Sequence, residues 1–278
     1  MFNRLVYLLL FTFFAFSSLS VYGQQNRVWP DDEKRGTKRK PAAVQKSPAN
    51  VEEGSHTPEA RLQKAVRHFD ENALAVLTEE LSANTFGEAE YKVELLLAKC
   101  HLARCDLRRF MRKTYDLEKK QDKEYRKEEA ELAEAGLVHA QRALELDPRS
   151  SEAHRVAGEL YIHEITGPIA GFRFGPKGRT EIEKAIELDP KNPEARRAIG
   201  LMYLYNPAIN GGDPKKAAET FDSVVKMGGD DRAYVLAGRA YLKLENLSTA
   251  KERFAAALKA NPKNVEAKEL LKQMEGGR

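Results

Sequence analysis

The stretch "DRAYVLAGRAYLKLENLSTAKERFAAALKANPKNVEA", residues 231–267, decides the fold of this chain. Its apolar residues recur at helical spacing on both sides of a polar turn, which predicts two antiparallel helices. Gly238 and Ala250 are small residues on the facing helices, so the two helices can approach closely. Tyr241 and Phe254 fill the space between successive pairs. This stretch therefore predicts one helical pair within a packed series.

The phrase that closes this stretch occurs three times in the chain. It reads "DPRSSEA" at 147–153, "DPKNPEA" at 189–195 and "NPKNVEA" at 261–267, at intervals of 42 and 72 residues. The second interval contains one more junction, "GGDDRAY" at 228–234, in which glycines replace the proline. Each phrase ends one helix, because a proline such as Pro262 cannot continue it, and opens the next. Self-similarity of this length indicates an array of helical pairs.

When Asp231 is numbered as position 1, the small and aromatic residues and the proline fall at fixed positions of the repeat. These are Gly238 at position 8, Tyr241 at 11, Ala250 at 20, Phe254 at 24, Ala257 at 27 and Pro262 at 32. In this spacing the chain resembles the tetratricopeptide repeat (TPR) family. Gly158 and Tyr161 hold positions 8 and 11 of one earlier repeat, and Gly200 and Tyr203 hold them in the next. The resemblance implies an all-α fold, a TPR-type right-handed helical solenoid of about four helix pairs with a C-terminal capping helix.

These patterns divide the folded part of the chain. The solenoid is expected at 58–278, with divergent helices at 58–150, TPR-like repeats at 151–192, 193–230 and 231–264, and a capping helix at 265–275. The charged segment between the divergent helices is expected to be either a long solvated helix extension or a mobile loop.

The first 57 residues lie outside the predicted solenoid. Residues 1–23 have a short basic start, an apolar core and a small-residue exit, which is the pattern of a signal peptide cut after Gly23. The alternative is an uncleaved membrane anchor. Residues 24–57 form a charged linker that cannot bury enough apolar surface to order itself. We therefore expect an exported protein, periplasmic or secreted.

Two helical pairs carry extra residues in the turn between their helices. The inserted segments read "GPIAGFRFGPKGRTEI" at 167–182 and "NPAINGGDPKKAAETF" at 206–221. The second is not a phosphate loop of the Walker type, because no hydroxyl follows its lysines and a helix precedes it. Stacked repeats place the two insertions side by side. Four cations lie at the expected helix starts and are expected either to be solvated at the tips of the turns or to contact an anion: Lys177, Arg179, Lys215 and Lys216.

Other chemistry is sparse. The 46 basic and 42 acidic residues nearly cancel, which gives little warrant for nucleic-acid binding. His101 and Cys105 lie one helical turn apart, but a metal site needs further ligands, and such a cysteine is usually a small buried hydrophobe. The chain offers no Ser, His and Asp set for nucleophilic catalysis. We expect no enzyme activity, no cofactor and no bound metal.

The resemblance to TPR proteins implies a groove lined by the first helix of each pair, which usually holds an extended or helical peptide. Nine positions are expected to face it: Arg155, Glu159, His163, Arg197, Leu201, Tyr205, Val235, Arg239 and Leu242. Their mixture of basic, aromatic and aliphatic groups fits a peptide of acidic character.

The expected function is an exported scaffold for protein–protein interaction. The alternatives are a periplasmic small-ligand or anion binder that uses the looped turns, which look similar to those of the helical-repeat component of TRAP transporters, and, more remotely, a hydrolase. Membrane contact is expected only through an uncleaved signal segment or the basic linker.

Overall fold

The computed structural model describes residues 57–114 and 119–276, and every element in these ranges is helical. The predicted signal peptide and all but the last residue of the predicted linker lie outside them. None of the helices in the described ranges combines the length and the apolar character needed to cross a bilayer. Export and signal cleavage therefore stay predictions.

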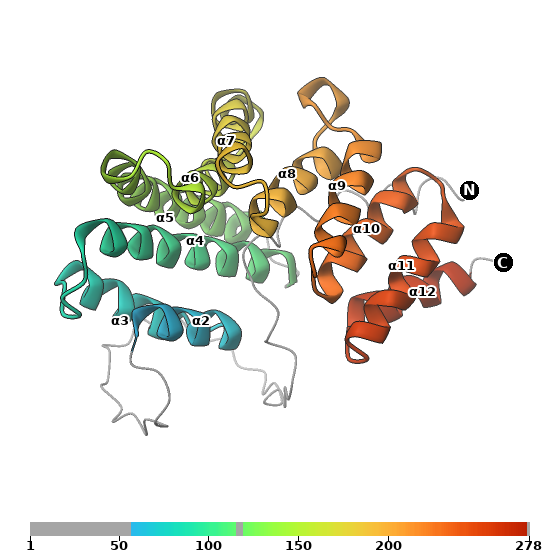
Figure 1. Ribbon diagram of the computed structural model, residues 1–278, viewed down its shortest axis with the longest axis horizontal. Helices are drawn as coiled ribbons and strands as arrows, with labels where there is room; N and C mark the ends of the chain where they lie inside the picture. The colour runs from blue at the N-terminus through green and yellow to red at the C-terminus, as the bar shows by residue number, and fades with distance from the viewer. Residues whose placement is uncertain (1–56, 115–118, 277–278) are drawn as a thin grey trace.

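The helices pack in consecutive pairs, each against the next along the chain (Figure 1). The pairs are α2 (Pro58–His68) with α3 (Glu71–Ser82), α4 (Glu90–Thr114) with α5 (Lys119–Leu146), α6 (Ser151–His163) with α7 (Pro168–Leu188), α8 (Pro193–Tyr205) with α9 (Pro214–Lys226), and α10 (Asp231–Lys243) with α11 (Leu247–Ala260). Helix α12 (Val265–Gly276) packs on α11 at the carboxyl-terminal end. The expected all-α TPR-type solenoid is confirmed, and its divergent part supplies two pairs, α2 with α3 and α4 with α5.

The repeated junction phrase owes its sequence to helix capping. Side chains of Ser150, Asn192, Asp230 and Asn264 each accept a hydrogen bond from the backbone N–H of an alanine three residues later, at 3.0, 3.0, 3.1 and 2.8 Å. A side-chain oxygen at this position satisfies an amide that the helix itself leaves unpaired. The phrase therefore fixes where α6, α8, α10 and α12 begin.

The glycines at repeat position 8 allow the paired helices to touch. A Cβ atom added at Gly238 would lie 2.5 Å from Phe254, and one added at Gly200 would lie 2.7 Å from Phe221. In the pair α6 and α7, a Cβ at Gly158 would lie 2.9 Å from the carbonyl oxygen of Gly178. These distances are far below van der Waals contact, so only glycine fits. Both phenylalanines are fully buried.

The first insertion is helical, which corrects the expectation of an elongated loop. Helix α7 begins at Pro168, so the extra residues lengthen its amino-terminal end. Lys177 and Arg179 consequently lie well inside the helix and not at its start. Phe174 covers this extension by stacking on Tyr161 of α6, with ring centroids 6.3 Å apart.

The second insertion is the expected elongated turn. It holds the short 3-10 helix η1 (Ala208–Asn210), and Gly211 follows with φ of 78°, a conformation that favours glycine. Asp213 caps α9 by accepting hydrogen bonds from the backbone N–H groups of Lys215 and Lys216 at 3.0 and 3.1 Å. The glycines and the aspartate therefore serve the turn geometry.

The close approach at position 8 yields a stability prediction. Gly238→Val should lower the free energy of unfolding by about 2 kcal/mol, because the added atoms overlap the buried ring of Phe254. Gly175→Ala in α7 is the matched control, since no atom lies within 4 Å of the added Cβ. This change should leave stability equal or raise it by about 0.5 kcal/mol through helix propensity. Urea unfolding followed by circular dichroism measures both, and equal effects would refute the close-approach explanation.

Candidate functional site

The residues expected to line the groove lie mostly inside the packed helices. Six are less than a tenth exposed: Arg155, Glu159, His163, Arg197, Leu201 and Val235. Three are half-buried: Tyr205, Arg239 and Leu242. The first helices of successive pairs touch one another, α4 with α6 and α6 with α8, so these residues lie along one row of helices. That they contact a partner stays a prediction.

A buried cluster of charges joins α4, α5 and α6. We call it the ionic core, and its members are Asp106 and Arg109 of α4, Glu129 of α5 and His163 of α6, each at most 6% exposed. The Nδ1 atom of His163 lies 2.8 Å from Glu129 Oε1, and its Nε2 atom lies 3.1 Å from Asp106 Oδ1. Arg109 donates from Nε to Glu129 Oε1 at 2.6 Å and from Nη2 to the carbonyl of Ile162 at 3.2 Å.

The charges of the ionic core stabilise one another. Burial opposes the charge of Glu129, but the guanidinium groups of Arg109 and Arg112 and the imidazole of His163 outweigh burial and lower the pKa of Glu129 to about 2. Burial and Arg109 act to lower the pKa of His163, but hydrogen bonds to Asp106 and Glu129 outweigh them, so this pKa is raised. Both ring nitrogens face carboxylate oxygens, an arrangement that favours the charged imidazolium.

Three members of the ionic core were not predicted from the sequence: Asp106, Arg109 and Glu129. Arg109 and Glu129 lie in the charged segment expected to be either a solvated helix extension or a mobile loop, and Asp106 lies just before it. The described parts are helical, and their inner faces are buried, not solvated. The signal was present in the spacing, because Asp106 and Arg109 continue the buried face of Leu102 at i+4 and i+7.

A second group of charges lies at the carboxyl-terminal end of the same row of helices. We call it the basic cluster, and it consists of Arg197 of α8 with Arg232 and Arg239 of α10. Arg197 is ion-paired with Glu194, and Arg239 donates from Nε to Glu266 Oε1 of α12 at 2.6 Å. Burial lowers the pKa of Arg232, and the positive charge of nearby Arg197 lowers it further. Two arginines that repel one another mark a place where added negative charge would be favourable.

The two insertions lie side by side, as the stacking of repeats predicts. Arg179 of α7 donates from Nη2 to the carbonyl of Gly211 in the second insertion, at 3.0 Å. Its guanidinium lies 5.3 Å from the ring centre of Tyr203, and the ammonium of Lys216 lies 5.8 Å from the same ring. Lys177 lies 5.6 Å from the ring centre of Tyr161. Anion binding by these cations stays a prediction.

The cysteines are packed as small hydrophobic residues. Cys100 and Cys105 are fully buried and unpaired with each other, and burial raises the pKa of the Cys100 thiol to about 12 and that of Cys105 well above its usual value. Burial and nearby His139 lower the pKa of His101 to about 4. Within residues 57–114 and 119–276, no group of three His, Cys, Asp or Glu side chains is placed to hold a metal ion.

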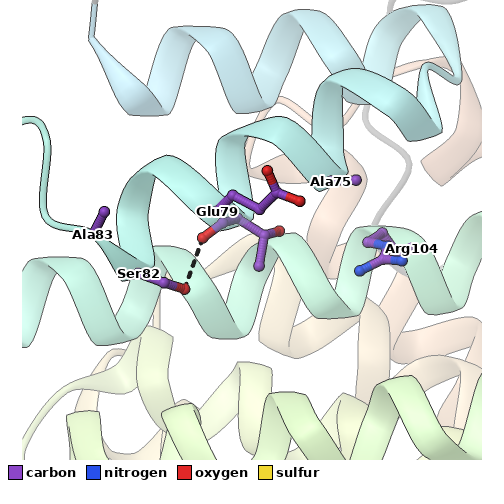
Figure 2. Close-up of a pocket in the computed structure, with 6 residues that line it drawn as sticks. Ala75, Glu79, Ser82, Ala83 and Arg104 are labelled. Carbon is purple, nitrogen blue, oxygen red and sulfur yellow. Dashed lines mark hydrogen bonds between the residues drawn. The ribbon is translucent and has the colours of Figure 1, made fainter. Parts of the chain in front are cut away.

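Figure 2 shows a hollow between α3 and α4, which no residue of either insertion lines. Its walls are small or polar: Ala75, Thr78, Glu79, Ser82, Ala83 and Arg104. Ser82 Oγ donates to the carbonyl of Thr78 at 2.8 Å, which is a local helix contact. None of the residues expected to bind a partner or an anion lines this hollow.

Comparison with known proteins supports the repeat assignment. The family model described as tetratricopeptide repeat matches residues 208–274. The fold is similar to that of TTC0263, a thermophilic TPR protein of Thermus thermophilus, at 14% identity with a TM-score of 0.55, over 78% of this chain and 98% of that one. No curated protein sequence gives a match.

Two further solved structures match with lower scores. MamA is 18% identical with a TM-score of 0.43, over 74% of this chain and 96% of that one. YrrB, described as a TPR protein with an unusual peptide-binding site, is 16% identical with a TM-score of 0.43, over 78% of this chain and all of that one (100%).

The ionic core makes stability depend on pH in a defined direction. Because the pKa of His163 is raised from 6.5, its stabilising contribution is complete below pH 6.5 and is lost as pH rises through the folded value. Because the pKa of Glu129 falls from 4.5 to about 2, its contribution is complete above pH 4.5 and is lost toward pH 2. The decrease in the free energy of unfolding caused by His163→Gln should therefore be largest near pH 5.5, about 3 kcal/mol, and smaller at higher pH.

Urea unfolding of the wild type and of His163→Gln between about pH 5 and pH 9 measures this difference. His68→Gln, at an exposed position in the last turn of α2, is the control and should change stability little at any pH. A stability loss in His163→Gln that stays constant across the range would contradict a charged His163.

Proposed function

Because the chain is a tetratricopeptide-repeat protein, we propose that it is an exported scaffold that binds a protein partner and catalyses no reaction. The solenoid supports this role, since a stack of helix pairs offers an extended surface for another chain. The ionic core supports the absence of catalysis. Both ring nitrogens of His163 lie within hydrogen-bonding distance of carboxylates, so it is not placed to activate a hydroxyl or thiol nucleophile.

The basic cluster is the observation that carries the choice of partner. Burial is the main cause of the lowered pKa of Arg232, the positive charge of Arg197 lowers it further, and Asp230, Asp231 and Glu266 offset these effects only in part, so an approaching carboxylate would stabilise the charged guanidinium. Arginine also binds carboxylates through paired hydrogen bonds. Tyr205 and Leu242 lie on the same helices, half-buried, and add apolar contact. The proposed partner therefore presents an acidic peptide segment to the first helices α8 and α10.

The proposal of export rests on the first 23 residues, whose basic start, apolar core and small-residue exit are typical of a signal peptide. When the full chain is expressed in a bacterial host, the mature protein should begin at Gln24 and should leave the cytoplasm. Amino-terminal sequencing and cell fractionation measure this. An intact Met1 in a cytoplasmic fraction would argue against export.

The binding proposal predicts a charge-dependent affinity. Fluorescence anisotropy of labelled 12-residue peptides should show binding of a Glu- and Asp-rich sequence and none of its Lys-rich counterpart. Replacing Arg232 and Arg239 together by Gln should lower the affinity for the acidic peptide by about tenfold, because the peptide's carboxylates lose buried charged partners. A steep decrease in affinity with salt should accompany binding of the wild type.

A matched variant controls for net charge. Lys259→Gln with Lys263→Gln removes the same two charges from exposed positions at the end of α11 and in the following junction. This control should bind the acidic peptide as the wild type does. If the two double variants lose affinity equally, the basic cluster is not the binding surface.

A further inference from the structure

The two insertions form one continuous surface at the turns of the helix pairs. Figure 1 shows the amino-terminal part of α7 and the turn between α8 and α9 rising at the upper edge of the molecule. The hydrogen bond from Arg179 to the carbonyl of Gly211, at 3.0 Å, ties them together. Arg179 and Lys216 also share the ring of Tyr203, which lies between the two. The two insertions are therefore in direct contact.

Three large apolar side chains stand out from this surface. Ile169 is 87% exposed, Phe172 is 75% exposed and Ile209 is 90% exposed, more than any other large apolar residue in the described ranges. Single exposed apolar residues are common, but three on two joined insertions indicate a contact surface. Side chains this exposed project outward and do not line a hollow.

The two insertions that carry these apolar side chains are rich in cations and contain few acidic residues, although the carboxylate of Glu164, just before the first insertion, interacts electrostatically with Arg173. Arg173, Lys177, Lys215 and Lys216 are all exposed. Residues 165–180 contain no acidic residue, and residues 206–218 contain only Asp213, which is engaged in capping α9. Arg179 is half-buried, and its Nη1 lies 3.6 Å from Glu183 Oε1. We call the three apolar residues and the four exposed cations the tip surface.

We propose that the tip surface docks this protein on an anionic phospholipid bilayer. Projecting apolar side chains insert among lipid chains, while surrounding lysine and arginine side chains bind the lipid phosphates. A peptide partner would need a groove to receive it, whereas the most exposed residues here protrude. This contact goes beyond the proposed scaffold function, because it uses the turns of the helix pairs and leaves the first helices free for a protein.

A fluorescent label at the tip tests this proposal in the full chain, even if the leader also binds lipid. Ile209→Cys gives a single reactive thiol, because Cys100 and Cys105 are fully buried. When this thiol is labelled with the environment-sensitive dye NBD, the fluorescence emission should shift to the blue and become brighter on addition of vesicles containing phosphatidylglycerol. Vesicles of phosphatidylcholine alone should cause no shift. The same label at Val265→Cys, an exposed position at the start of α12, should not respond to either.

Charge variants of the labelled chain test the role of the lysines. Lys177→Gln, Lys215→Gln and Lys216→Gln together should raise the lipid concentration needed for half of the shift by at least about tenfold. Lys259→Gln, Lys263→Gln and Lys272→Gln remove the same charge from exposed positions elsewhere and should leave it unchanged.

Three results would overturn the proposal. One is no shift at position 209 with anionic vesicles, and another is an equal shift at positions 209 and 265. The third is a shift caused by a polyglutamate peptide and not by vesicles, which would assign the tip surface to an acidic protein. None of these results bears on peptide binding by the basic cluster.

Discussion

The close approach of two helices within each pair is the constraint on which the rest of this structure depends. Gly238 against Phe254 and Gly200 against Phe221 leave no room for a Cβ atom, so each pair has one permitted spacing. The buried rings then form part of clusters that extend beyond their own pair: Phe221 belongs to the same buried cluster as Leu236 of α10, and Phe254 to the same cluster as Ala267 of α12. Where pairs stack in this way, the turns between paired helices fall on one edge and the first helices form one row. The tip surface and the basic cluster are consequences of that repetition.

The amino-terminal part of the solenoid joins its helices by other means. Gly136 of α5 gives the close approach there, since a Cβ added to it would lie 2.7 Å from His101. Between α4, α5 and α6 the ionic core takes the place of a buried aromatic ring. Replacing buried ion pairs by apolar residues often raises stability, so such pairs are better explained as fixing which helix faces meet. His163 of α6 lies within hydrogen-bonding distance of a carboxylate on α4 and of another on α5, and both contacts can form in only one arrangement of the three helices.

The fold was largely predictable from the sequence, because the glycine, aromatic and proline positions recur and each has a local cause. The caps at Ser150, Asn192 and Asn264 lie within the repeated phrase itself. The helical first insertion was not predictable in this way, because Pro176 and several glycines indicate a turn. Pro176 removes a hydrogen bond to the carbonyl of Phe172, an exposed residue where water can replace it. The ionic core was missed for a different reason: charged residues indicate solvent unless their partners, distant in sequence, are known.

The central claim is that glycine and phenylalanine at facing positions set the spacing of each helix pair. A double-mutant cycle with Gly238→Val and Phe254→Ala measures it by urea unfolding. Each single change should destabilise the protein, the first by overlap and the second by leaving a cavity. In the double variant the valine occupies space that the ring vacates, so the account predicts a combined loss smaller than the sum by at least about 1 kcal/mol. Additive losses would show that the two residues do not restrict one another, and would contradict the account.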